Sequence, residues 1–144
     1  MLDGEKINEK IAVASKIVCI GISNSDLTSR IDEDAMLEFI SNGGEIELYF
    51  LDPNGRYTAE REIEESLEKD FIKLITENNL RTAKALKESL PEPFKNNYRI
   101  YLYDISPRLN IIFVDDNLYL QFYGFISRGM DTPSFIIHKQ EVQS

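Results

Sequence analysis

The sequence of 144 residues has one cysteine, Cys19, one histidine, His138, and no tryptophan. A single cysteine excludes an internal disulfide and a cysteine-based zinc site. A single histidine excludes a His-rich metal site and any mechanism that needs two histidines within one chain. We therefore expect no resident metal and no cofactor.

Long apolar runs and an excess of cations are also absent. No stretch approaches the roughly 18 apolar residues of a membrane-spanning helix, and the N-terminus has no signal-peptide pattern. The 16 Lys and Arg are outnumbered by 25 Asp and Glu, which gives a formal charge of −9. Because nucleic acids and anionic membranes are bound by clustered cations, we expect no general nucleic-acid binding and no membrane partner. The pattern predicts a cytoplasmic protein, or one domain of a longer chain with a covalently linked partner domain.

The remaining composition is that of a folded domain. The chain is 42% hydrophobic and 28% charged, with only seven glycines and five prolines. This apolar content is too high for a disordered chain, and the length suits a single core. We expect one domain over residues 1–144.

Helix and strand patterns alternate in the first third of the chain. An amphipathic helix is predicted over 5–14, a strand over 16–22, a helix over about 31–41 and a second strand over 45–51. A strand, a helix and a strand at this spacing form a βαβ unit, so the two strands should be parallel. The first strand is apolar almost throughout, which favours a sheet covered on both faces.

The rest of the chain changes from helix to strands. Residues 57–90 predict helical structure that can break at Asn78-Asn79, and its expected apolar stripe is Ile63, Leu67, Phe71, Leu74 and Ile75. Four further strands are predicted over 98–103, 110–114, 118–123 and 134–138, with a hairpin turn at 115–117. The expected fold class is therefore α/β, a single domain with a mixed β-sheet of about six strands and helices on both faces.

Two local patterns resemble one half of the phospholipase D superfamily. The first runs from Val18-Cys19-Ile20-Gly21-Ile22-Ser23 through a helix to the strand that follows Gly43-Gly44. The second is the hairpin over residues 108–120, which stands where that family carries His-x-Lys-x-x-x-x-Asp. The resemblance spans nearly the whole chain and implies a phospholipase D-like fold.

The catalytic motif is degraded in this sequence. When Asp115 is aligned with the family's aspartate, Arg108 takes the histidine position and Asn110 takes the lysine position. A guanidinium stays protonated and has no lone pair with which to attack phosphorus, and asparagine supplies no cation. The resemblance therefore implies a scaffold without catalytic residues, like the small bacterial phospholipase D-like domains that accompany regulators or defence proteins.

Polar residues follow both strands of the βαβ unit. Ser23, Asn24 and Ser25 come after the first strand, and Asp52 and Arg56 come after the second. Ligands collect at the carboxyl ends of parallel strands, where backbone N–H groups and helix N-termini attract anions. These residues, with Arg61, could bind a phosphate or a ribose. Ordinary turns and a helix N-cap are the simpler explanation of the same residues.

Four later residues complete the predicted ligand site. Arg108 and Asn110 could hold phosphate without cleaving it, because a guanidinium pairs bidentately with phosphate oxygens. Tyr123 and Arg128 follow the hairpin, and a tyrosine ring can stack on a base. The alternatives are an exposed arginine and strand tyrosines at the edge of the core. Asp115 and Asp116 are more simply turn formers than metal ligands.

Three functions remain open from the sequence. The first is a non-catalytic ligand-sensing or regulatory domain that binds a small phosphorylated or nucleotide-like molecule. The second is a phosphodiesterase or nuclease completed by a homodimer, with His138 as its base. The third is a structural dimerisation module for a linked partner domain.

Overall fold

The computed structural model describes residues 15–25, 32–106, 109–122 and the backbone of 134–138. Ten elements follow along the chain: β1 (Lys16–Gly21), α3 (Glu33–Ser41), β2 (Glu45–Leu51), α4 (Arg56–Glu64), α5 (Phe71–Ser89), α6 (Glu92–Lys95), β3 (Tyr98–Tyr103), β4 (Leu109–Val114), β5 (Asn117–Phe122) and β6 (Ser134–His138). The helix expected over 5–14 lies outside the described residues. No helix among them is both long and apolar enough to cross a membrane.

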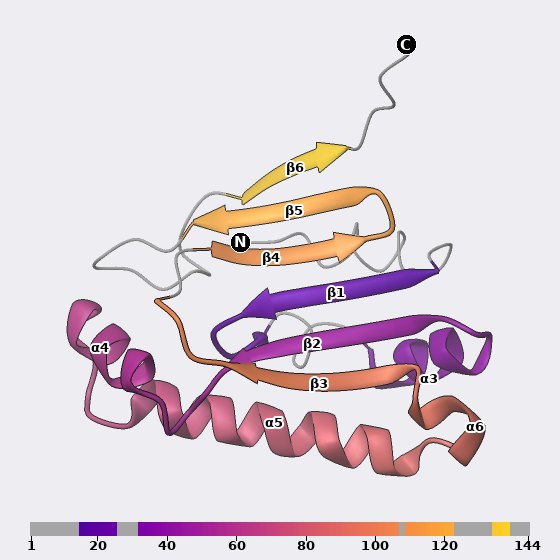
Figure 1. Ribbon diagram of the computed structural model, residues 1–144, viewed down its shortest axis with the longest axis horizontal. Coiled ribbons are helices and arrows are strands. Elements are labelled where there is room, and N and C mark those ends of the chain that lie inside the picture. The colour runs from indigo at the N-terminus through magenta and orange to yellow at the C-terminus, as the bar shows by residue number, and fades with distance from the viewer. Residues whose placement is uncertain (1–14, 26–31, 107–108, 123–133, 139–144) are drawn as a thin grey trace.

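All six strands form one mixed sheet in the order β3-β2-β1-β4-β5-β6 (Figure 1). β1 pairs in parallel with β2, and β2 pairs in parallel with β3. β4 runs antiparallel to β1 on its other side and continues into the antiparallel β5 and β6. The expected α/β domain with a parallel βαβ unit and a C-terminal hairpin is confirmed.

Local sequence fixes both ends of α3. The Asp32 side chain accepts a hydrogen bond from the Asp34 backbone N–H at 3.1 Å, which caps the helix start. After the helix, Gly43 adopts φ +93°, a conformation that side chains disfavour. A Cβ on Gly44 would lie 2.4 Å from the Phe39 ring, so the glycine lets the chain pass close to the helix. The short Asn-Gly-Gly segment thus ends α3 and lets the chain turn tightly into β2.

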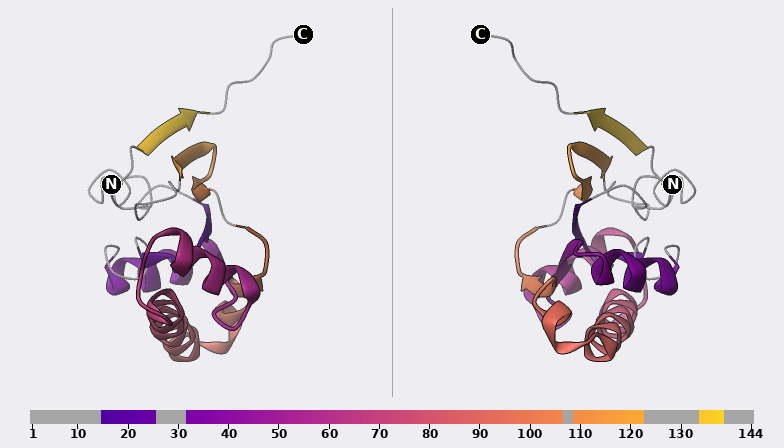
Figure 2. Two further views of the ribbon diagram at one scale, coloured as in Figure 1. Left: turned by 90° about the vertical axis from the view of Figure 1, so that its left-hand side faces the viewer. Right: turned by 90° about the vertical axis from the view of Figure 1, so that its right-hand side faces the viewer.

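The described helices α3 and α5 pack against the same face of the sheet (Figure 2). On β1 to β5, the side chains of this helix-covered face are buried: Ile17, Cys19, Ile46, Leu48, Phe50, Tyr98, Ile112, Val114 and Tyr119. Over most of the opposite face, which we call the open face, no described helix packs, and only at its carboxyl end do Leu51 and Tyr103 contact Ile72 and Tyr57 of the helices. The described helices lie mainly against one face, and β1 is buried on that side only: Val18 and Ile20 stay half-exposed.

The predicted helix over 57–90 is two helices. The break falls at residues 65–70, where Ser66 and Asp70 adopt positive φ angles, and α5 runs through Asn78-Asn79 without interruption. The break shifts the phase of the helical repeat, so Ile63, Phe71 and Leu74 of the expected stripe are exposed. The buried face of α5 consists instead of Ile72, Thr76, Asn79, Leu80, Ala83 and Leu86.

The β4–β5 turn forms at Asp115 and Asp116 as expected. The Asp115 carboxylate accepts hydrogen bonds from the backbone N–H groups of Ser15 and Lys16 at 2.9 Å each, and the Asp115 N–H donates to the Lys16 carbonyl. This aspartate therefore ties the hairpin to the start of β1. Among the described residues, no group of three or more His, Cys, Asp or Glu could hold a metal ion.

Candidate functional site

Buried polar residues gather at one end of the molecule, the end at which the parallel strands β1, β2 and β3 terminate. We call this group the carboxyl-end cluster. Its ten members are Ser23, Asn24, Thr58, Arg61, Glu62, Glu65, Thr76, Asn79, Asn110 and Gln121. They come from the loop after β1, from α4, from the first half of α5, from the start of β4 and from the end of β5. The opposite half of the core contains Met36, Phe39, Ile40, Leu86, Leu90 and Tyr98.

The loop after β1 is held by its own polar side chains. Asn24, with φ 52°, donates from Nδ2 to the Tyr49 carbonyl at 2.8 Å. The hydroxyls of Ser23 and Ser25 are hydrogen-bonded to each other at 2.8 Å. Asn79 reaches this loop from α5, and its Nδ2 donates to the Ser23 carbonyl at 3.0 Å and to the Ser25 hydroxyl at 3.1 Å. The predicted Ser23–Ser25 segment thus serves as a structural turn, with its two hydroxyls at the centre of the cluster.

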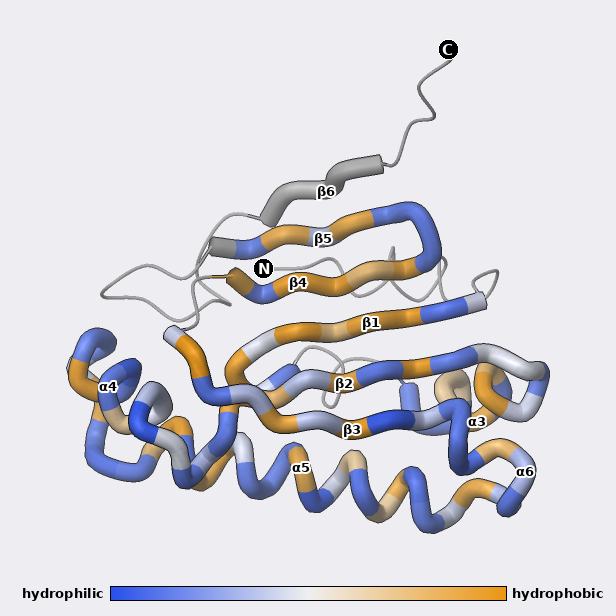
Figure 3. The backbone as a smooth tube through the Cα atoms, in the orientation of Figure 1, coloured by the Kyte–Doolittle hydropathy of each residue, from blue (hydrophilic) through white to orange (hydrophobic). Residues whose placement is uncertain are grey.

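Helix α4 is mostly hydrophilic along its length (Figure 3). Its buried residues are polar, while its isoleucine, Ile63, is 78% exposed. Thr58, Arg61, Glu62 and Glu65 recur at the i, i+3, i+4, i+7 spacing of one helix face, and all four are buried. The Arg61 side chain is 1% exposed and pairs with Glu65 at 2.9 Å and with Glu64 at 3.2 Å. Arg61 therefore forms a buried ion pair instead of reaching toward a ligand at the Ser23–Ser25 loop.

The neighbouring Glu62 connects α4 to α5. Its Oε2 accepts from the Ile72 backbone N–H at 2.7 Å and from the Lys73 N–H at 3.3 Å. Asp70, at the N-cap position of α5, makes no side-chain capping bond. The carboxylate of Glu62 thus supplies the missing cap and places negative charge at the positive end of the helix dipole.

Two amides complete the cluster on the sheet. Asn110 Nδ2 lies 3.5 Å from Gln121 Oε1, across the β4–β5 pair. The β1–β4 register, continued by one residue beyond Ile20 and Ile111, places Asn110 beside Gly21, from which the Ser23–Ser25 loop leaves. The structure therefore brings Asn110 to the same end as the loop, as the predicted site requires.

Asp52 and Arg56 are occupied by local contacts. The Asp52 carboxylate accepts from the Asn54 N–H at 2.9 Å, and its carbonyl accepts from the Thr58 hydroxyl at 2.7 Å. Arg56 is exposed and pairs with Glu60 at 2.8 Å. Both contacts fit the simpler interpretation of this segment as a turn followed by a helix start, and neither residue points to a ligand.

The remaining predicted residues lie outside the described part of the chain or away from the cluster. Arg108, Tyr123 and Arg128 lie outside the described residues, so their roles stay predictions. The backbone of His138 pairs in register with Asn117, which lies at the other end of β5 from Gln121, the strand partner of Asn110. Cys19 is buried in the core on the helix-covered face.

A family model matches residues 5–144 of the chain, and its description is "Domain of unknown function (DUF5919)". The chain belongs to the DUF5919 family. No curated protein matches it.

One solved structure similar to this DUF5919 chain is that of TrmBL2, an archaeal chromatin protein described as showing a novel mode of DNA binding. The two are 13% identical with a TM-score of 0.48, and the match covers 94% of this chain and 41% of TrmBL2. This neighbour runs against our expectation of no general nucleic-acid binding, and we withdraw that expectation as wrong. DNA binding is a property of TrmBL2, and a likeness at this level assigns no partner to the DUF5919 chain.

Sequence reasoning missed Thr76, Asn79 and Gln121 as members of the cluster. The signal available for α4 was the polar repeat at 58, 61, 62 and 65, which an analysis of apolar stripes assigns to solvent. No comparable signal marks Asn79 or Gln121, since their partners lie 56 and 11 residues away in the chain.

Proposed function

We propose that this DUF5919 domain is a non-catalytic, ligand-sensing regulatory module that binds a small phosphorylated or nucleotide-like molecule at the carboxyl-end cluster. The observation that carries the proposal is the confinement of all ten buried polar residues of the described chain to the carboxyl ends of the parallel strands. Ligands of open α/β sheets bind at this edge. In keeping with the sequence, we place this function in the cytoplasm.

The chemistry of the cluster supports binding over bond cleavage. Ser23, Asn79, Asn110 and Gln121, with the adjoining half-buried Ser25, offer hydroxyls and amides. These groups recognise phosphate and sugar oxygens but supply neither a nucleophile of the family type nor a cation at the Asn110 position. The fully buried Thr76 hydroxyl has no hydrogen-bond partner among the described residues. A buried polar group without a partner costs about 1–3 kcal/mol, which a structural role alone does not explain.

Thermal unfolding against a panel of nucleotides, sugar phosphates and inorganic phosphate tests the proposal. A ligand at about 100 times its Kd stabilises the fold by about 2.7 kcal/mol, which raises the Tm of a domain of this size by roughly 8 °C. We expect Asn110→Leu to abolish the shift. Arg56→Ala is the matched control, since Arg56 lies at the same end but is exposed and paired with Glu60, and it should keep the shift. No stabilisation by any member of the panel would refute the proposal.

A further inference from the structure

The open face of the sheet has an apolar half on β1, β4 and β5. Its members are Val18, Ile20, Ile111, Phe113, Leu118 and Leu120, none of which is buried. The register makes them contiguous: Val18 lies beside Phe113 and Ile20 beside Ile111, and these two β4 residues lie beside Leu118 and Leu120. Next to them on the helix-covered face, Ile17, Cys19, Ile112, Val114 and Tyr119 are buried. Figure 1 looks onto this face, and no described helix crosses it.

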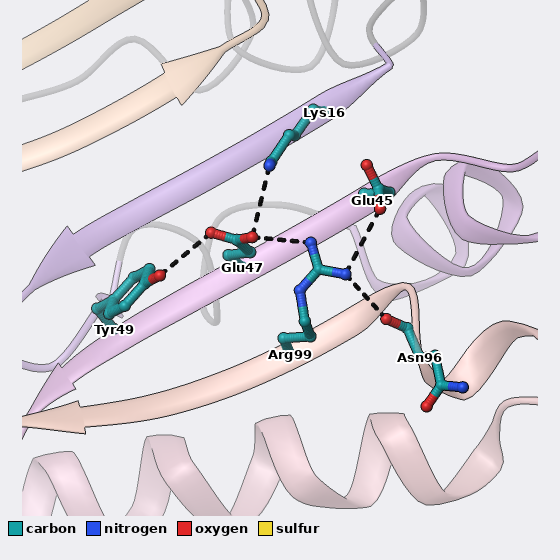
Figure 4. A network of polar contacts seen from close by, with 6 residues as sticks. All are labelled: Lys16, Glu45, Glu47, Tyr49, Asn96 and Arg99. Carbon is teal, nitrogen blue, oxygen red and sulfur yellow. Dashed lines mark hydrogen bonds and ion pairs between the residues drawn. The ribbon is translucent and has the colours of Figure 1, made fainter.

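The other half of the open face is a closed set of ion pairs on β1, β2 and β3 (Figure 4). Glu47 lies 2.7 Å from Arg99 and 3.5 Å from Lys16, and it accepts a hydrogen bond from the Tyr49 hydroxyl at 3.2 Å. Arg99 also lies 3.5 Å from Glu45. These two cations and two carboxylates cancel, so the open face is locally neutral on a chain of formal charge −9.

We propose that the open face is the interface with a second copy of this chain, in which the apolar half of each copy covers the apolar half of the other. A two-fold axis through the apolar half produces this arrangement, because a two-fold interface uses the same patch on both subunits. The ion-paired halves then lie at the rim, which gives the apolar centre and polar border of a specific interface. The two sheets would pack about 10 Å apart, as in a β-sandwich.

Charge and size favour a second copy over other occupants. Two acidic chains repel each other, and the neutral face is where they can approach at the lowest electrostatic cost. Both cations are already paired with glutamates, so a polyanion would have to break those pairs to bind here. The two halves of the face together span the five strands β1 to β5, which at about 4.8 Å apart and six residues in length present roughly 500 Å² per copy. Two copies together reach about 1,000 Å², the lower limit for a specific interface, whereas a docked helix about 10 Å wide covers less than half of the face.

The oligomeric state of the full chain tests this proposal. We expect sedimentation equilibrium to give twice the monomer mass of 16.6 kDa at high concentration. On dilution the measured mass should fall toward that of the monomer. Phe113→Glu buries a charge twice in the two-fold interface and should raise the dimer Kd at least 100-fold. The matched control is Ile63→Glu, which also replaces an apolar residue by glutamate but at a more exposed position on α4. It should leave the dimer Kd unchanged. A monomer at all concentrations, or a dimer that Phe113→Glu leaves intact, overturns the proposal, as does equal disruption by Ile63→Glu.

Two additions make the test decisive. Leu118→Glu, directly opposite Phe113 in register, is a second disruptive variant, and an unchanged far-UV circular dichroism spectrum shows that each variant folds.

The second addition is a fluorescent mixed-sequence single-stranded oligonucleotide. Wild type and Tyr101→Ala are each titrated into it, and the change in anisotropy measures binding. Tyr101 stacks on Tyr49 with 4.9 Å between ring centroids, and such a pair could stack on bases. A monomeric chain that binds the oligonucleotide through Tyr101 would assign the face to nucleic acid and overturn the proposal.

Discussion

The two ends of the core differ in composition: one is apolar, and the other combines a small apolar cluster with ten buried polar residues. At the amino end of the parallel strands, α3 and the second half of α5 bury Met36, Phe39, Ile40, Leu86 and Leu90. At the carboxyl end, α4 and the first half of α5 bury a small apolar cluster of Ile22, Leu51 and Ile72. Beside it they bury an arginine, two glutamates and a series of amides and hydroxyls. Helix α5 passes through both ends, and its buried residues change from Thr76 and Asn79 to Ala83 and Leu86 within about three turns. The comparison shows that non-directional apolar packing holds the amino end, while the carboxyl end also depends on specific ion pairs and hydrogen bonds.

The largest expected effect comes from breaking the buried ion pair. Arg61→Leu leaves Glu65 as a buried carboxylate without its arginine and should lower the free energy of unfolding by about 3–5 kcal/mol. Urea denaturation measures this loss. The double variant Arg61→Leu/Glu65→Leu should recover part of it, because a buried pair replaced on both sides is often tolerated. A single variant as stable as wild type would mean that the carboxyl end does not depend on this pairing.

A cavity at the apolar end should cost nearly as much. Ile40 is fully buried, and Ile40→Ala is expected to lower the free energy of unfolding by about 2–5 kcal/mol. Ile40→Val, which removes one methylene group, should cost about 0.5–1.5 kcal/mol. If the ligand-induced rise in Tm is unchanged in Ile40→Val, the two ends are functionally separate. A smaller rise would show that packing at the apolar end affects ligand binding.

The cap supplied by Glu62 should have an intermediate effect. Glu62→Ala removes the acceptor of two backbone N–H groups at the start of α5 and should cost about 1–3 kcal/mol. Glu62→Gln keeps an acceptor oxygen without the charge and should cost less. Hydrogen exchange of the Ile72 and Lys73 amides provides a local measurement, and unchanged protection in Glu62→Ala would contradict the assignment of this residue as the cap.

The smallest expected effect is that of an ion pair outside the core. The hydrogen bond from Arg99 lowers the pKa of the Glu47 carboxyl below its usual value of 4.5. Glu47→Gln should cost only about 0.2–1 kcal/mol at pH 7, in contrast to Arg61→Leu. A lowered pKa gives stability that is present above the usual pKa and is lost as the pH falls through the folded value. The difference between wild type and Glu47→Gln in urea should therefore shrink below about pH 4.5, and a difference that grows there would contradict the pairing.

The sequence predicts the strands and their connections well, because period and turn chemistry determine them locally. The apolar runs at 16–22 and 45–51 are strands, and the acidic turn at 115 forms the hairpin. The open face was not predictable, because near-continuous apolar residues in β1 look the same whether Val18 and Ile20 meet a helix or stay half-exposed. The predicted apolar stripe over 57–90 is wrong because the helix is interrupted at residues 65–70. This break of six residues changes which positions face inward.

The candidate site was predicted only where its residues directly follow a strand. Ser23, Asn24, Ser25 and Asn110 lie at the predicted edge, although the loop residues serve first as a turn. Arg61 was expected to face a ligand, and its buried position with Glu65 depends on the packing of α4 against α5. Such positions depend on tertiary contacts that the local sequence does not carry.

The position of β1 in the middle of the sheet affects how the chain is made. Its partner on one side, β2, follows within 24 residues, but β4, on the other side, begins only at Leu109. At 5–20 residues per second, translation of the roughly 90 intervening residues takes about 5 to 18 s. During that interval the nascent chain exposes an unpaired apolar strand edge at Ile17 and Cys19, a template for misassembly with a neighbouring chain. Ribosome-associated chaperones would therefore be needed most before the hairpin emerges from the exit tunnel.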